Sequence, residues 1–158
     1  MIYLNNTMLV ALNSNDFNKQ NIVIGEKVTN NIMKNSHFYR LNYSANEYTM
    51  NGIYIYFELV NVKCELHFNK LRCGFNKEKN KEIIDKIKII EKKILNSFTH
   101  NKNKKQITHI SDQFDNGNLK IFNDKVLQNK FILKISGYWS NEYEYGLTYK
   151  FFAVNQQL

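Results

Sequence analysis

The alternation of apolar and polar residues is most regular near the end of the chain, in FILKISGYWSNEYEYGLTYKFF, residues 131–152. It predicts two strands, 131–139 and 146–154, joined by a turn rich in Tyr and Glu. Successive side chains of a strand point to opposite faces, so each parity forms one face. The predicted core face is Phe131, Leu133, Ile135, Gly137, Trp139, Leu147, Tyr149, Phe151 and Ala153. The predicted outer face is Ile132, Lys134, Ser136, Tyr138, Thr148, Lys150 and Phe152.

A second stretch of alternation follows an Asn-Gly turn signal at 51–52. Its period of two predicts strand from 53 onward and a hairpin over 60–75, with an apolar face and a basic-polar face. The apolar set is Val60, Val62, Cys64, Leu66, Phe68, Leu71, Cys73 and Phe75. The apolar parity changes near Leu59 and Val60, which predicts a bulge or a sharp coil there.

Between these strand regions, residues 77–98 follow the spacing of a helix. Their apolar residues recur at intervals of three and four, and Lys and Glu occupy the other side. Glu82 and Lys86 are spaced as a stabilising pair on a helix. The apolar stripe is Ile83, Ile84, Ile87, Ile90, Ile94, Leu95 and Phe98.

The remaining segments are weaker. Short apolar pieces at 8–12, 22–25 and 38–43 predict strands separated by Asn-rich loops, and Asp115-Asn116-Gly117 predicts a tight turn. No linker or repeat divides the 158 residues. We therefore expect a single domain, 1–158, with N-terminal strands or an extension over 1–50 and the core over 51–154.

The order of strands, one long helix and further strands predicts a mainly β fold. It favours an OB-fold-like antiparallel Greek-key barrel with an α-helix inserted at about 77–98. A β-sandwich with one peripheral helix is the alternative.

The chain is basic, with a formal charge of +8, which favours anionic polymers or membrane surfaces as partners. Only Arg40 and Arg72 are Arg among its 22 basic residues. Abundant Lys, Asn and Ile with no Pro is also typical of AT-rich coding, which is a competing explanation of the charge. Neither a signal peptide nor a long apolar run is present, so we expect an intracellular protein that is not secreted and binds no membrane.

Catalytic and metal-binding motifs are absent from the sequence. The four His and six Gly residues are scattered, and no phosphate-binding loop or nucleophile elbow occurs. Cys64 and Cys73 lack the spacing of a zinc site, and a reduced pair on one apolar face is favoured over a disulfide. We expect no enzyme activity, no cofactor and no metal; a metal-dependent nuclease using Asp112 and Asp115 is the weaker alternative.

Basic residues interleaved with aromatic residues on predicted strands favour binding of single-stranded nucleic acid. Such sites combine a positive groove with flat rings on which bases stack. Outward parity selects Lys63, His67, Lys70 and Arg72 on the hairpin and Lys134, Tyr138 and Lys150 on the last two strands. The aromatic candidates are Tyr54, Tyr56, Tyr138, Trp139, Tyr143 and Tyr145, although parity alone assigns Trp139 to the core.

The segment FILKISGYWSNEYEYGLTYKF resembles the C-terminal strand-turn-strand of OB-fold-like single-stranded-DNA-binding proteins of large DNA viruses and virus-like linear plasmids. The resemblance covers about the last 25 residues and implies a ligand surface near Lys134, Trp139, Tyr145 and Lys150. Many single-strand binders end in an acidic tail, whereas this sequence ends FFAVNQQL.

The predicted function is therefore non-catalytic binding of single-stranded DNA, favoured over RNA, with low sequence specificity in viral or plasmid-type replication or recombination. The predicted site is Lys63, Lys70, Arg72, Lys134, Tyr138, Trp139, Tyr145 and Lys150. Homo-oligomerisation stays open. The alternative is a viral structural or protein-interaction β-domain that binds no nucleic acid.

Overall fold

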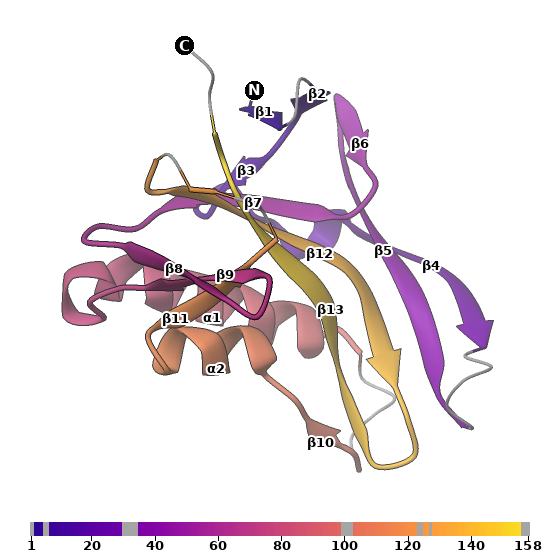
Figure 1. The fold of residues 1–158 in the computed structure, drawn as a ribbon. Helices are drawn as coiled ribbons and strands as arrows, with labels where there is room; N and C mark the ends of the chain where they lie inside the picture. Colours follow the sequence, from indigo (N-terminus) through magenta and orange to yellow (C-terminus); the bar gives the residue numbers. More distant parts are fainter. Residues whose placement is uncertain are drawn as a thin grey trace.

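The computed structural model describes residues 2–4, 7–29, 35–98, 103–122, 125–126 and 128–155. A long hairpin lies at the centre of its main sheet. The hairpin consists of β12 (Lys130–Ser140) and β13 (Glu144–Ala153) (Figure 1). Both predicted C-terminal strands are thereby confirmed.

Each outer edge of this hairpin is shared by two strands that lie one after the other. Along β12, residues 130–135 pair with β7 (Ile53–Glu58) and residues 137–140 pair with β5 (His37–Ala45). Along β13, β10 (Lys105–Gln106) pairs at the beginning and β11 (Asn118–Ile121) near the end, both in parallel. The β12–β13 hairpin thus joins the two halves of a single sheet.

The other strands extend this sheet outward. Beyond β11 lie β9 (Lys70–Gly74) and β8 (Lys63–His67), and β3 (Leu12–Asn13) pairs with β7. Both β4 (Ile22–Thr29) and β6 (Tyr48–Met50) pair with β5, while β1 (Ile2–Leu4) and β2 (Thr7–Leu9) form a separate ribbon. The sheet is mixed and is not closed in the part of the chain that the structure describes.

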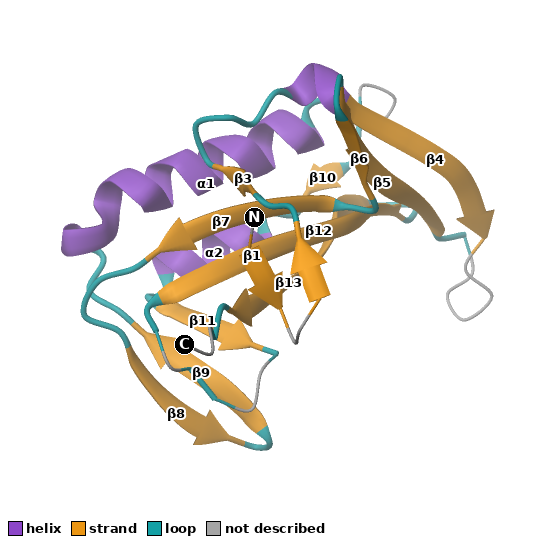
Figure 2. Cartoon of the chain, turned by 90° about the horizontal axis from the view of Figure 1, so that it is seen from above, coloured by secondary structure: helices purple, strands orange, loops and turns teal. Residues whose placement is uncertain are grey.

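Two helices cover one side of the sheet, α1 (Lys81–Leu95) and the shorter α2 (His109–Asp115) (Figures 1 and 2). Short 3₁₀ turns occur at η1 (Lys19–Asn21) and at η2 (Glu78–Asn80), directly before α1. The core between helices and sheet is apolar: Phe114 of α2 contacts Phe57 and Phe151, with ring centroids 5.9 and 5.7 Å away. The predicted apolar stripe is buried in α1 at Ile84, Ile87, Ile90, Ile94 and Leu95, whereas Ile83 is half-buried.

Two buried polar side chains fix the helices to the rest of the fold. The Asn80 side chain accepts a hydrogen bond from the backbone N–H of Val60 (2.8 Å) and donates one to the Val60 carbonyl (3.0 Å). The Glu91 carboxylate, 1% exposed, accepts the backbone N–H groups of Ile110 (3.0 Å) and Ser111 (2.8 Å) at the start of α2. Burial raises the pKa of Glu91, although the hydrogen bonds from Ser111 and Ile110 oppose that effect.

The mainly β class with one long helix is confirmed, and the helix lies where the 3.6-residue period predicts it. The Glu82–Lys86 pair is present at 2.6 Å. The parity change at Leu59 and Val60 marks the chain leaving β7 for β8. Helix α2 was not predicted, because its seven residues bury only Ile110 and Phe114.

A β-bulge in β12 overturns part of the predicted face assignment. Ile135 pairs with Tyr149 and Gly137 with Thr148, so Ser136 is an extra residue in β12. One extra residue exchanges the faces of every side chain after it. Tyr138 is therefore buried on the helix side, whereas parity placed it outside.

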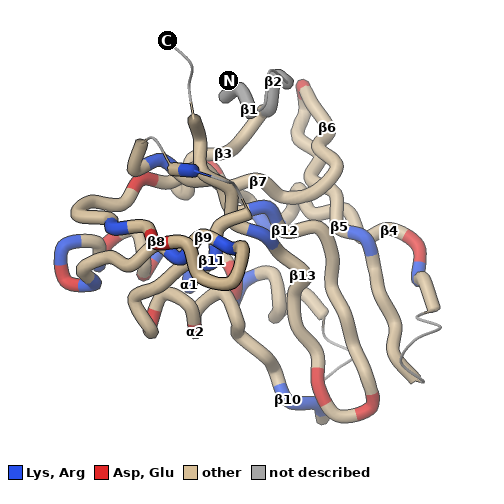
Figure 3. Tube along the Cα trace, viewed as in Figure 1, with Lys and Arg blue, Asp and Glu red and all other residues tan. Residues whose placement is uncertain are grey.

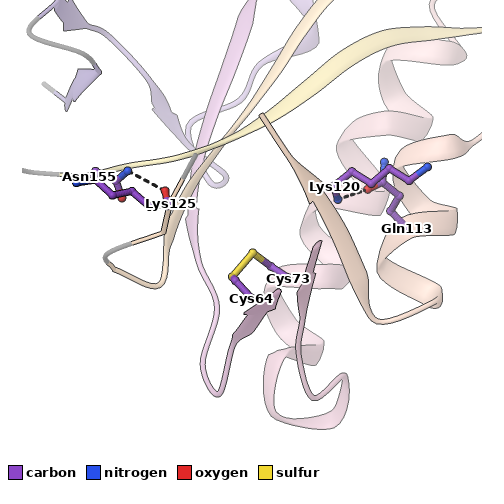
Figure 4. The surroundings of a disulfide bond; sticks show 6 residues. All are labelled: Cys64, Cys73, Gln113, Lys120, Lys125 and Asn155. Atoms are coloured by element: carbon purple, nitrogen blue, oxygen red, sulfur yellow. Dashed lines mark hydrogen bonds between the residues drawn. A yellow bond between two sulfur atoms is a disulfide. The ribbon is translucent and has the colours of Figure 1, made fainter. Parts of the chain in front are cut away.

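The two cysteines form a disulfide, contrary to the predicted reduced pair. Cys64 and Cys73 are directly opposite each other on β8 and β9, and their sulfurs are bonded (Figure 4). Parity placed both on one face correctly, but sequence alone does not show that they share a register.

The apolar face of this hairpin is only half buried. Leu71 and Cys73 of β9 lie in the core, whereas Leu66 is 71% exposed and Phe68 is 89% exposed. β8 is the outermost strand, and Phe68 lies in the turn to β9, with a φ of 47°. Leu66 and Phe68 belong to the predicted apolar set but are not buried, because the sheet ends at β8.

Candidate nucleic-acid interface

Basic and aromatic residues form a line across five neighbouring strands, on the face of the sheet opposite the helices. Lys134 of β12 is opposite Lys150 of β13 on one side and Tyr54 of β7 on the other. Phe122 directly follows β11, and Lys70 begins β9, the next strand of the sheet. We call Tyr54, Lys134, Lys150, Phe122 and Lys70 the basic–aromatic row.

Contacts between cations and rings connect the members of this row. The Lys134 Nζ lies 5.2 Å from the centre of the Tyr54 ring. Two ammonium groups share the Phe122 ring, Lys150 at 5.0 Å and Lys70 at 5.7 Å. Attraction between a cation and a ring face holds these side chains over the sheet.

The row is open to solvent, and within the described part of the chain its lysines have no acidic partner. Phe122 is 48% exposed, Lys70 and Lys150 are exposed, and Tyr54 and Lys134 are half-buried. Among the described residues none of the three lysines forms an ion pair. Lys and Arg positions of β9, β11 and β12 lie close together in the middle of the molecule, while acidic positions mark the β12–β13 turn (Figure 3). The row can therefore offer both positive charge and flat apolar surface to a ligand.

Three further candidate residues belong to the same face of the hairpin. Arg72 of β9 lies opposite Glu65 of β8 and Lys120 of β11. Lys63 begins β8, where it pairs with Gly74, so it stands at the outer edge of the sheet. His67 is opposite Lys70 near the hairpin turn. Both His67, opposite Lys70, and Arg72, two residues from Lys70 on β9, are therefore neighbours of the row.

Tyr138 and Tyr145 do not lie on this face. Tyr138 is fully buried and stacks on Phe98, with ring centroids 3.6 Å apart. Burial raises the pKa of Tyr138 to about 12. Tyr145 is 8% exposed, and its hydroxyl accepts a hydrogen bond from the Gln106 side chain (2.9 Å). Placing Tyr138 outside was wrong because of the Ser136 bulge, and both rings belong to the packing beneath the sheet.

Trp139 takes the outer side that parity had given to Tyr138. It is half-buried and lies over Gly146, where an added Cβ would be 2.8 Å from the indole ring. The ring of Phe38 covers Gly137 in the same way, since a Cβ there would overlap it. Trp139 is thus on the face of the row but beside β5, near the other end of β12.

The other aromatic candidates divide by position. Tyr56 is on the outer face of β7, but its hydroxyl donates a hydrogen bond to the Glu58 carboxylate, and burial together with this bond raises the pKa of Tyr56. Tyr143 is 72% exposed in the β12–β13 turn. Phe122 was missed, although the alternation of Leu119 and Ile121 inward with Lys120 and Phe122 outward carries the signal.

A polar pocket adjoins the row where β11 and β13 separate. It is a cavity of about 390 Å³ lined by Arg72, His109, Asp112, Gln113, Asn116, Asn118, Lys120 and Tyr149. Burial raises the pKa of Tyr149, so its hydroxyl stays protonated at neutral pH. Of these residues, Arg72 belongs to the predicted nucleic-acid site and Asp112 to the nuclease alternative.

The two acids of the nuclease hypothesis serve other contacts. Asp112 lies 3.4 Å from the His109 imidazole, and Asp115 accepts a hydrogen bond from Lys88 at 2.7 Å. Both belong to α2 rather than to a loop. The described residues include no group of three or more His, Cys, Asp or Glu that could hold a metal ion.

Comparison with protein-family models, with curated proteins and with solved structures finds no match for this chain. Within the part of the chain that the structure describes, no helix is long and apolar enough to cross a membrane. The row and the pocket are therefore the features of the described structure that bear on function.

Proposed function

We propose that the protein binds single-stranded DNA without catalysis and with low sequence specificity. The observation that carries this proposal is the basic–aromatic row, in which three lysines and two rings cross five adjacent strands on the helix-free face. Ammonium groups attract phosphates, and a ring can stack on a base of any sequence. A row of this composition therefore suits a flexible strand whose bases are unpaired.

The biological setting belongs to the same proposal. The C-terminal resemblance to single-stranded-DNA-binding proteins of large DNA viruses and linear plasmids favours a role in replication or recombination inside the host cell. Lys134 and Lys150, two of the residues that the resemblance implies, are members of the row. Tyr145 is buried, so its expected place at the ligand surface is not part of the proposal.

The test compares two triple variants with the same loss of charge. Lys70→Gln/Lys134→Gln/Lys150→Gln changes the row, whereas Lys81→Gln/Lys92→Gln/Lys93→Gln changes exposed positions of α1. Fluorescence anisotropy with labelled oligo(dT) at several salt concentrations measures the affinity and its salt dependence. Each lost phosphate contact lowers the slope of log K against log salt by roughly 0.7 for a single strand.

We expect the row variant to bind more weakly and to lose a slope of roughly 2, while the α1 variant keeps most of its affinity. Equal losses in both variants would show that net charge alone attracts the DNA. No binding by the unmodified protein at about 50 mM salt, which favours phosphate contacts, would refute the proposal.

A second candidate function, a protein-interaction domain, is favoured by the apolar surface of β4. Val23, Ile24 and Val28 are 46%, 47% and 54% exposed. β4 pairs only with β5 among the described strands, so its other edge is open to another chain. Sedimentation of the unmodified protein in the same buffers distinguishes the two, because concentration-dependent self-association without DNA binding would favour this function.

A further inference from the structure

The polar pocket lies outside the row, between β11, β13 and α2. Among the described residues, β11 pairs with β13 only at Ile121 and Phe151, and toward Asn118 the two strands separate. Helix α2 packs against both strands at this point. The resulting cavity of about 390 Å³ lies within the range of small-ligand sites in proteins.

Two cations, Arg72 and Lys120, line this pocket. Arg72 and Lys120 are directly opposite each other on β9 and β11. Glu65 is the cross-strand neighbour of Arg72 on β8, yet among the described residues neither Arg72 nor Lys120 forms an ion pair. The planar guanidinium offers several N–H donors that match the oxygens of a phosphate.

The neutral residues of the pocket are held in place by hydrogen bonds. The Gln113 side chain accepts the backbone N–H of Lys120 (2.9 Å; Figure 4) and donates to the Tyr149 hydroxyl (2.6 Å). That hydroxyl in turn donates to the His109 carbonyl (3.3 Å). Because α2, β11 and β13 are tied together in this way, the pocket wall is organised before a ligand arrives.

The charged residues that line the pocket favour a negatively charged ligand. Asp112 is the one carboxylate among the described lining residues, and it lies beside the His109 imidazole at 3.4 Å. Arg72 and Lys120 outnumber it, and a metal cation would be repelled by both. The chemistry therefore favours a small anion with several oxygen acceptors.

We propose that this pocket binds a phosphate group, either free or at the end of a nucleic-acid strand. The terminal-phosphate source rests on the proposed function, whereas binding of free phosphate does not. Arg72 is two residues from Lys70 on β9, and Lys120 is two residues from Phe122, so the pocket begins roughly 7 Å from the row. A strand lying on the row could place its last phosphate there.

The first experiment uses inorganic phosphate with the full chain. In ¹H–¹⁵N spectra at constant ionic strength, we expect saturable shifts of the Gln113 side-chain amide and the Lys120 backbone amide. Arg72→Gln and Lys120→Gln should each weaken this binding roughly tenfold, as expected for loss of a charge-assisted hydrogen bond. Lys81→Gln and Lys93→Gln on α1 should leave it unchanged. Both pocket positions are exposed, and thermal melting confirms that the variants fold.

The second experiment compares oligo(dT) bearing a 5′-phosphate, a 3′-phosphate or only hydroxyl ends. A preference for one phosphorylated end that Lys120→Gln abolishes identifies the strand terminus as the source. Saturable phosphate binding without such a preference identifies free phosphate, and it supports the pocket even if no oligonucleotide binds and the proposed function fails. If the spectra show no saturable shifts and the oligonucleotides show no end preference, the phosphate site is refuted.

Discussion

At the scale of single residues, Lys134 and Lys150 are the most informative pair. They stand directly opposite each other on β12 and β13, where like charges destabilise a sheet by a fraction of a kcal/mol. No carboxylate among the described residues forms an ion pair with either lysine. A bound phosphate would relieve this repulsion, so a ligand of the row should also stabilise the fold.

Phe122 provides the test of stacking. Phe122→Ala removes the ring that Lys70 and Lys150 share, and a stacked base contributes about 1–3 kcal/mol. We expect affinity for oligo(dT) to fall roughly 5- to 150-fold in an anisotropy titration. The melting temperature should change little, because the side chain is 48% exposed.

Tyr143→Ala is the matched control for Phe122→Ala. Tyr143 is 72% exposed but lies in the β12–β13 turn, outside the row. The Tyr143→Ala variant should bind oligo(dT) with the affinity of the unmodified protein. An equal loss of affinity in both variants would place the stacking surface elsewhere.

Glu91 makes folding stability depend on pH. Its pKa is raised above the ordinary value of 4.5, so the folded chain holds this proton more tightly than the unfolded chain. The contribution of Glu91 to the free energy of unfolding therefore falls as pH rises from 4.5 through the raised pKa. Urea unfolding across pH 4–7 of the unmodified protein and of Glu91→Gln isolates this contribution as a difference.

The Glu91→Gln variant should also be less stable overall. Its single amide oxygen cannot replace two carboxylate oxygens that accept from Ile110 and Ser111. Leaving a buried donor unsatisfied costs about 1–3 kcal/mol. If the difference between variant and unmodified protein did not change with pH, Glu91 would not be the titrating group.

At the scale of elements, the strands and the long helix could be predicted because their side chains alternate between core and solvent at fixed periods. The bulge was not predicted, because a Gly within a strand can mark either a bulge or the close approach of another group, and the Phe38 ring does approach Gly137 closely. Its effect is local, and that is why Lys134 was placed correctly while Tyr138 and Trp139, only a few residues later, were exchanged. α2 escaped prediction because two buried residues do not define a helical period.

The β8–β9 hairpin is the element whose stability depends on redox conditions. The disulfide joins residues nine apart, and closing a loop of that size stabilises a fold by about 2–3 kcal/mol in the chain-entropy account. Reduction should lower the free energy of unfolding by this amount, measured by urea unfolding with and without a thiol reductant. The free energy of unfolding of Cys64→Ser/Cys73→Ser should equal that of the reduced protein and should not change with the reductant. If the reductant also destabilised this double variant, the disulfide would not be the cause.

At the scale of the whole molecule, the row brings together side chains that are far apart in the sequence. Along the chain, the β8–β9 hairpin, both helices and β11 separate Tyr54 from Lys150. The strands of these two residues nevertheless both pair with β12. Period-2 parity predicts the face of a residue but not its neighbouring strand, because pairing depends on contacts across the fold. The lysines of the candidate site were therefore predictable one by one, and their assembly around Phe122 was not.

The bulge at Ser136 has a consequence for how the length of this strand can vary. The bulge lies between the part of β12 that pairs with β7 and the part that pairs with β5, so each half of β12 has its own partner strand. An insertion or deletion of one residue elsewhere in β12 would exchange the inner and outer side chains between that point and Ser136. Related chains should therefore change the length of β12 by pairs of residues, or by one residue at the bulge together with a redesigned core around Tyr138.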